Sequence, residues 1–272
     1  MFKRELKCNF KNFMIWTIII LVLFGVVFAI YPSIASSDNI KSIDELAQIF
    51  PPEILSAFNM DIASLSTMFG WLKSEGFVMI LLIVGVYAGI LGSNILVKEE
   101  NDKTIEYLNS LPISREKIVL SKAFVGIIYI LLITITISIF NFIGLELSGD
   151  YNREQYILMS ITPIFSSLVI YSLCLFISTF THKTKNTLGL SLGIVFISFI
   201  FNAISGIDKS VAWLKYISVF TLADIRNVIL NIEVNPIMII ISFLITSVFI
   251  LLSTINYKRK NLVQLKITNY NS

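Results

Sequence analysis

The charged segment Lys98–Lys122 holds the residues whose types and spacing are best suited to chemistry. It is the longest charged segment between two strongly apolar blocks and reads KEENDKTIEYLNSLPISREKIVLSK. An acidic pair followed by an amphipathic pattern can make ionic and apolar contacts, but it offers no arrangement for making or breaking bonds. We therefore interpret this segment as the place where a molecule outside the membrane acts on the membrane-spanning part of the chain.

A short surface helix is predicted for the first half of the segment. Asn101 or Asp102 can cap it by accepting backbone N–H bonds, and acidic side chains suit the positive end of the helix dipole. Ile105, Leu108 and Leu111 recur every three residues and form one apolar stripe. The pattern predicts a coupling helix over 102–111 with one apolar face.

A corner and a second helix are predicted to follow. Pro112 lacks the N–H that a continuing helix would use and disfavours helix at the residue before it. Ser114 is a good cap for a new helix that would run into the apolar block beginning at Ala123. Physical chemistry alone leaves a second interpretation open, in which the segment is a solvated loop with a helix lying on anionic lipid.

The segment resembles the one that follows the second span of bacterial ABC-type-2 exporter permeases. In those proteins an acidic pair precedes a Thr-hydrophobic-Glu-x-Leu run and a Leu-Pro-hydrophobic-Ser-Arg turn. Many members have Gly before that Thr, whereas this chain has Lys103, which leaves the contact geometry open. The positions that match are Glu99, Glu100, Thr104, Ile105, Glu106, Leu108, Leu111, Pro112, Ser114 and Arg115.

The resemblance implies a function as the permease subunit of an ATP-driven exporter. Its coupling helix would dock on a separate ATP-binding subunit, which would hold ATP and Mg, and a second permease, identical or a paralogue, would complete the path. The residues that it implies for docking and coupling are Glu99, Glu100, Thr104, Glu106, Leu108, Leu111, Pro112 and Arg115. Cargo would be hydrophobic or amphipathic, such as antimicrobial or cytolytic peptides, lipids or drugs.

The sequence lacks the motifs that mark several kinds of catalytic site. There is no Gly-x-x-x-x-Gly-Lys-Ser/Thr loop, so P-loop ATP hydrolysis must come from a partner chain, and there is no His-Glu-x-x-His. The single histidine, His182, lies in a basic turn, where a solvated side chain is expected rather than a metal ligand. Glu99-Glu100 faintly resembles the Glu-Glu-x-x-x-Arg of membrane-embedded prenyl-protein proteases, but Thr104 stands where Arg is needed. We expect no catalytic residue, cofactor or metal site in this chain.

Composition places the chain among polytopic all-α integral membrane proteins. Of its 272 residues 56% are hydrophobic and 14% charged, and the mean hydropathy is +0.81. Cys8 lies near the end of the first apolar block and Cys174 lies inside another, so no disulfide framework is expected.

Six membrane spans in a single domain, 1–272, are predicted from the apolar blocks. The first is longer than the apolar region of about 7–15 residues typical of a signal peptide, so we expect an anchor rather than a cleaved segment. The second and fifth contain Gly85-x-x-x-Gly89 and Gly189-x-x-x-Gly193, a spacing that lets helices approach closely. The predicted spans are about 13–31, 77–97, 123–145, 156–180, 187–205 and 236–255, with the coupling segment at 98–122.

The distribution of charge predicts that both termini are cytoplasmic, and the resemblance implies that the membrane is a bacterial plasma membrane. With the N-terminus inside, fifteen of the 21 basic residues lie in cytoplasmic segments. The outer segments before the second and sixth spans read as amphipathic stretches that rest at the membrane surface. Together with the connector between the third and fourth spans, they give the outer face twelve acidic residues against six basic ones, which would attract a cationic peptide weakly because salt screens the field.

The centres of the spans lack ionisable residues, which argues against a proton- or ion-coupled transporter. Polar groups there, including Tyr87, Ser93, Thr134, Asn141, Ser172 and Ser178, can bond between helices or line a path for an amphipathic substrate. Two other function classes stay open: a membrane scaffold or sensor that recruits a cytoplasmic partner, and a secondary transporter.

Overall fold

Six long helices make up most of the chain in the computed structural model, which describes residues 1–34, 67–102, 104–105, 112–149 and 151–260. All six are long and apolar enough to cross a membrane. The shortest, α10, has 21 residues, which at 1.5 Å each span about 30 Å, the thickness of the hydrocarbon core. The six spanning elements are α1 (Phe2–Ile34), the run α4–η2–α5 (Met68–Trp71, Leu72–Gly76, Phe77–Ile95), α8 (Arg115–Ser148), α9 (Arg153–Ser178), α10 (Thr184–Ile204) and α12 (Pro236–Arg259).

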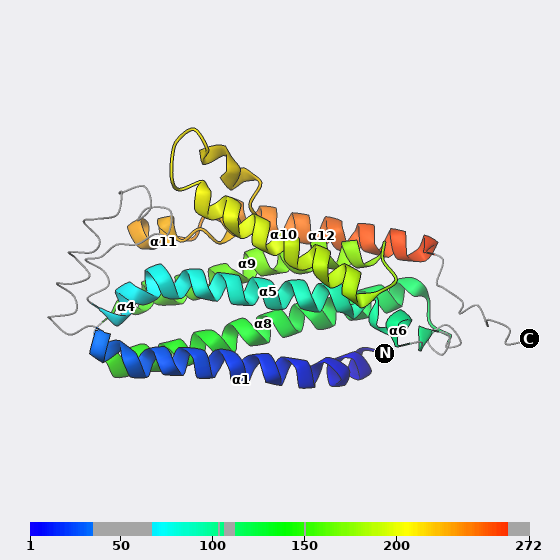
Figure 1. The fold of residues 1–272 in the computed structure, drawn as a ribbon, viewed down its shortest axis with the longest axis horizontal. Coiled ribbons are helices and arrows are strands. Elements are labelled where there is room, and N and C mark those ends of the chain that lie inside the picture. Colours follow the sequence, from blue (N-terminus) through cyan, green and yellow to red (C-terminus); the bar gives the residue numbers. More distant parts are fainter. Residues whose placement is uncertain (35–66, 103, 106–111, 150, 261–272) are drawn as a thin grey trace, which may run out of the picture.

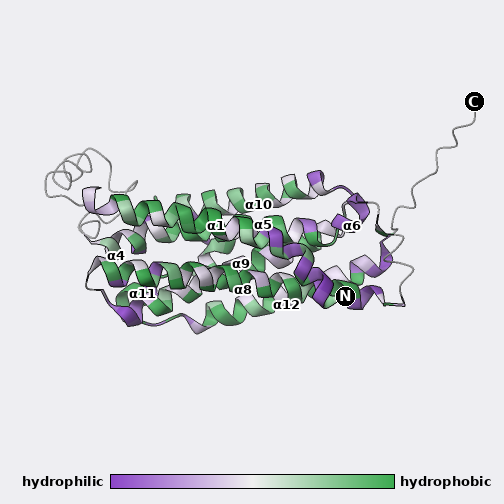
Figure 2. Cartoon of the chain, turned by 90° about the horizontal axis from the view of Figure 1, so that it is seen from below, coloured by the Kyte–Doolittle hydropathy of each residue, from purple (hydrophilic) through white to green (hydrophobic). Residues whose placement is uncertain are grey.

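The prediction of an all-α integral membrane protein with six transmembrane helices is confirmed, and the described residues contain no strand. The N-terminus, the end of α12 and the short helix α6 (Lys98–Asn101) lie at the same end of the bundle, which we call the α6 end (Figure 1). Hydrophilic residues collect toward the ends of the helices and hydrophobic residues fill the length between them (Figure 2). The chain is a multi-pass membrane protein.

Several helices extend beyond the apolar blocks that predicted them. Helix α1 already begins at Phe2, and α8 begins at Arg115, where Ser114 accepts a hydrogen bond from the N–H of Lys117 at 3.3 Å. The predicted cap at Ser114 and the predicted helix start at Pro236 are both confirmed. Helices extend in this way because caps and hydrogen bonds end a helix, whereas hydropathy marks only the part that lies in lipid.

The outer segments predicted to be amphipathic contain short helices in the part that the structure describes. Before the second span, residues 35–66 lie outside the described part, while Met68–Trp71 continues through the π-helical turn Leu72–Gly76 into α5. Before the sixth span, three short helices occur: η3 (Ala212–Tyr216), η4 (Val219–Ala223) and α11 (Arg226–Asn231).

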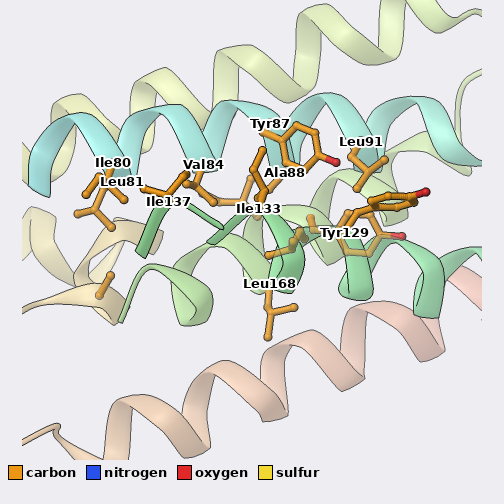
Figure 3. Packing of buried hydrophobic residues seen from close by; sticks show 14 of the residues in the cluster. Ile80, Leu81, Val84, Tyr87, Ala88, Leu91, Tyr129, Ile133, Ile137 and Leu168 are labelled. Carbon is orange, nitrogen blue, oxygen red and sulfur yellow. The ribbon is translucent and has the colours of Figure 1, made fainter. Parts of the chain in front are cut away.

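The core of the bundle lies between α5, α8 and α9. Apolar side chains of α5 face those of α8 across this core, and Leu168 comes from α9 (Figure 3). Helix α1 packs on α8, α10 on α5, and α12 on α9 and α8. The central set consists of Ile80, Leu81, Val84, Tyr87, Ala88, Leu91, Tyr129, Ile133, Ile137 and Leu168.

Four serine and threonine hydroxyls inside the spans donate to carbonyls of their own helices. Ser93, Thr134, Ser172 and Ser178 each donate to a carbonyl three or four residues earlier, at 2.5–3.0 Å. These four hydroxyls therefore donate within their own helices, and a role of the polar groups in lining a substrate path stays a prediction. A carbonyl one turn away is always within reach of a helical Ser or Thr, so the polar group is satisfied without a neighbour.

Asn141 is a buried polar residue whose side-chain oxygen and nitrogen both lack a partner in the part of the chain that the structure describes, and it leads to a first prediction. Its side chain is 1% exposed, lies beside a small cavity between α5, α8 and α9, and has no hydrogen-bond partner among the described residues. A buried amide without a partner costs about 1–3 kcal/mol. Asn141→Leu should therefore raise the free energy of unfolding by about 1 kcal/mol, measured by thermal unfolding in detergent. Asn202→Leu is the control, because Asn202 accepts a bond from Thr221 at 3.4 Å, and equal stabilisation by both variants would contradict the interpretation.

Candidate functional site

The acidic pair of the charged segment lies on α6, two residues after α5 ends. Consecutive helical residues point about 100° apart, so the two carboxylates face different neighbours. Glu99 is 5% exposed, and the side chain of Glu100 is 3% exposed. Both carboxylates therefore point into the protein at the α6 end.

Glu99 takes part in a buried ionic cluster, the Lys122 junction, made of Glu5, Glu99 and Lys122. The Lys122 ammonium donates to Glu99 Oε1 at 2.6 Å, to Glu5 Oε2 at 3.1 Å and to the carbonyl of Ile95 at 2.6 Å. A lysine ammonium has three N–H donors, and all three are used. Since Lys122 is 1% exposed, these bonds are shielded from water and only weakly screened by salt.

The Lys122 junction joins four helices. Glu5 belongs to α1, Ile95 is the last residue of α5, Glu99 belongs to α6, and Lys122 lies two turns into α8. The carbonyl of Ile95 is one of those that a helix leaves unpaired at its C-terminal end, where a positive charge is favourable. The next helix is connected too, because the hydroxyl of Tyr171 on α9 donates to the carbonyl of Lys122 at 3.1 Å.

Glu100 takes part in a second cluster, the Lys260 cluster, made of Glu100, His182 and Lys260. The Lys260 ammonium donates to Glu100 Oε1 at 2.6 Å and to the carbonyl of Thr181, and His182 Nδ1 lies 2.6 Å from Glu100 Oε2. Burial lowers the pKa of the Lys260 ammonium, and the hydrogen bond to Glu100 opposes part of that shift. This cluster connects α6 with the turn between α9 and α10 and with the end of α12.

Arg115 joins the corner before α8 to the same end of α12. Its Nη1 donates to the carbonyls of Lys258 and Lys260 at 3.0 and 2.9 Å. Neighbouring Glu116 forms an ion pair with Lys258. Cationic donors suit the last carbonyls of a helix, so Arg115 acts as a C-terminal cap for α12.

The remaining predicted coupling residues lie at or beyond the limit of the described chain. Thr104 is exposed, and its N–H donates to the carbonyl of Glu99 at 2.9 Å, while Pro112 is exposed at the corner. Glu106, Leu108 and Leu111 lie outside the described residues, as does most of the predicted coupling helix.

The two residues predicted to cap the coupling helix lie at the end of α6. Asn101 is the last residue of α6 and Asp102 is its C-cap, and the cap of the coupling helix stays a prediction because most of 102–111 lies outside the described residues. In the helical turn that begins at Lys98, Glu99 and Glu100 each accept a hydrogen bond from a buried ammonium group, which stabilises the turn.

The four predicted packing glycines differ in their surroundings. A Cβ at Gly85 would lie 2.9 Å from the ring of Phe220, and one at Gly89 would lie 3.1 Å from Val195 Cγ2. At Gly189 and Gly193 a Cβ would meet no atom within 4 Å. The role of these glycines in helix packing stays a prediction.

Sequence reasoning missed Glu5, Lys122 and Lys260 as site residues and gave His182 only a solvated side chain. Two signals were available. Glu5 is the single acid among the first 37 residues, and Lys122 directly precedes an apolar block. No local pattern marks Lys260 in its basic tail. Within the part of the chain that the structure describes, no group of three or more His, Cys, Asp or Glu residues could hold a metal ion.

Comparisons with known proteins identify the family. A family model described as "ABC-2 family transporter protein" matches residues 1–262, nearly the whole chain. The comparison with curated proteins gave no match. The chain therefore belongs to the ABC-2 family of transporter proteins and is a membrane-spanning permease subunit of an ABC transporter rather than its ATPase.

Proposed function

We propose that the chain is the permease of an ATP-driven exporter in a bacterial cytoplasmic membrane, with the α6 end facing the cytoplasm. The observation that carries the proposal is that the acidic pair before residues 102–111 is bonded to Lys122 of α8, to Lys260 at the end of α12 and to His182 in the turn between α9 and α10. Lys122 in turn bonds to Glu5 of α1. A displacement of that segment would therefore be transmitted to most helices of the bundle. The excess of basic residues in the segments at this end supports the orientation.

In this proposal a separate ATP-binding subunit docks on the segment 98–122. ATP and Mg are bound by that subunit, and its closure moves residues 102–111. Two routes pass the motion on: α6 through its two carboxylates, and the corner 112–114, where Ser114 caps α8 and Arg115 holds the end of α12. Glu99, Glu100 and Arg115 then serve coupling from inside the permease, while Thr104, Glu106, Leu108 and Leu111 are the candidates for direct contact.

The proposed cargo is hydrophobic or amphipathic, with antimicrobial or cytolytic peptides, lipids and drugs as the classes to test. Charged side chains lie toward the ends of the six spans, so the bundle offers no charged site at mid-membrane for an ion or a sugar phosphate. A second permease, identical or a paralogue, would complete the path.

Leu108→Asp should abolish co-purification of the ATP-binding subunit that docks on this chain, because a carboxylate cannot be buried in an apolar contact without a partner. The matched control is Asn109→Asp, which adds the same charge to the same segment outside the apolar stripe. Insertion is checked by membrane fractionation and by gel filtration of the detergent-solubilised chain. Normal co-purification of Leu108→Asp would contradict docking at this segment.

ATP hydrolysis by the purified complex tests the cargo. A hydrophobic cationic peptide should raise the rate several-fold, whereas a hydrophilic peptide of the same length and charge should not. A complex that forms normally but responds to neither peptide nor to lipid would contradict the cargo class. Failure of the unaltered chain to bind any ATPase would instead favour a scaffold that recruits another cytoplasmic partner.

A further inference from the structure

Glu5 is the one charged residue of α1 that turns into the protein. Around it Lys3, Arg4 and Lys7 are exposed, whereas Glu5 is 4% exposed and bonds to Lys122. Burying a carboxylate in an otherwise solvated helix end is costly unless it is paired, so its position depends on that ammonium. This is a specific connection between α1 and the base of α8.

The same connection reaches α6 because Lys122 is shared. Glu5 and Glu99 accept from one ammonium, so α6 cannot shift relative to α1 without losing a charge-assisted bond in a site closed to water. Beside this junction, Tyr129 of α8 donates its hydroxyl to the carbonyl of Leu6, and its ring packs on Phe13 at 5.3 Å. Charge and packing therefore hold α1, α6 and the first half of α8 together.

Helix α10 provides the contrast. Its buried residues, Thr187, Ser191, Val195 and Ser198, are uncharged, and no ion pair within the described part of the chain involves a residue of α10. Its connection to α6 runs through the preceding turn, where His182, 44% exposed, lies against Glu100 and the carbonyl of Thr181 accepts from Lys260. Within the described residues, a buried ionic cluster thus includes a residue of α1 itself, whereas α10 is connected to α6 through the turn that precedes it and not through a charged residue of its own.

We propose that Glu5 is a positioning residue that makes α1 move with α6 and α8 as one rigid unit when the ATPase acts, while α10 moves relative to that unit. The inference rests on the proposed function, since it concerns the motion that docking would drive. The inference gives a role in coupling to α1, a helix that lies outside the coupling segment 98–122.

Spin-label distances in the ATPase-bound complex, with and without ATP, test this inference. One label is placed at Asn101 on α6, and the other either at Phe10 on α1 or at Leu190 on α10, all of which are exposed. Cys8 is replaced by Ser because it is exposed, while Cys174 is buried and stays. Labelled chain is diluted with unlabelled chain so that only distances within one chain are measured.

In the parent chain, ATP should shift the Asn101–Leu190 distance and leave the Asn101–Phe10 distance narrow and unchanged. Glu5→Leu, which removes only the α1 side of the junction, should broaden the Asn101–Phe10 distribution and make it respond to ATP. Glu146→Leu is the control: it breaks the pair of Glu146 with Arg153 at the other end of the bundle and should behave like the parent. If Glu5→Leu does not fold, Glu5→Gln takes its place, with the same direction of change expected.

Three results would overturn the inference while co-purification of the ATPase is normal: an unchanged Asn101–Phe10 distance in the Glu5 variant, an ATP-driven shift of that distance in the parent, or no shift of the Asn101–Leu190 distance in the parent. If the parent binds no ATPase, the proposed function fails and the inference fails with it. The co-purification step separates these two kinds of failure.

Discussion

Lys122→Met should lower the free energy of unfolding by about 3–5 kcal/mol, the cost of leaving buried charges without their partner. Two carboxylates, Glu5 and Glu99, would then face each other out of water, and the carbonyl of Ile95 would lose its donor. Thermal or denaturant unfolding of the purified chain in detergent measures the loss. We expect Lys122→Met to unfold well before the parent chain and to be recovered from membranes in lower yield.

Two controls separate this effect from a general intolerance of substitution. Lys117→Met lies on the same helix at an exposed position and should change the free energy of unfolding by less than about 0.5 kcal/mol. The triple variant Glu5→Gln/Glu99→Gln/Lys122→Met removes all three charges and should recover most of the loss, because a buried triad can be replaced by neutral side chains at little cost. A triple variant as unstable as Lys122→Met would show that packing, not charge, sets the effect.

The membrane fold could be predicted from sequence because each of its signals is local. Apolar blocks of about 20 residues set the six helices, and single residues set two of their starts, Ser114 and Pro236. Lipid requires every backbone group to bond within its own segment, which leaves a helix as the only choice for such a block. Helix ends were less predictable, since α8 starts at Arg115, two turns before its apolar block begins at Ala123.

The candidate site could be predicted only in part because its pairs are distant in sequence. Glu5 and Lys122 are 117 positions apart, and Glu100 and Lys260 are 160 apart, so no window of residues reveals that they meet. The acidic pair was identified, but as surface contacts for an ATPase. Its burial follows from which helices pack together, which the spacing of residues within one segment does not encode.

Gly92→Ala should be the most disruptive single-methyl change in the second span, costing about 2–3 kcal/mol of unfolding free energy. The new Cβ would lie 2.5 Å from the carbonyl oxygen of Tyr171 and 3.1 Å from the backbone nitrogen of Leu175. Backbone atoms of α9 cannot rotate away as a side chain would, so α5 and α9 must separate. Unfolding of the purified variant in detergent gives the cost.

Gly193→Ala is the matched control for that change, since its Cβ would meet no atom within 4 Å in this chain. In a helix, Ala is favoured over Gly by about 1 kcal/mol, so this variant should be neutral or slightly more stable. If the two Gly→Ala variants change the free energy of unfolding in opposite directions, the close contact of α5 with α9, rather than helix propensity, requires glycine at position 92. A Gly92→Ala chain as stable as the parent would mean that α5 and α9 can move apart at no cost in unfolding free energy. That result would contradict the close packing of α9 at Tyr171, whose hydroxyl donates to the carbonyl of Lys122.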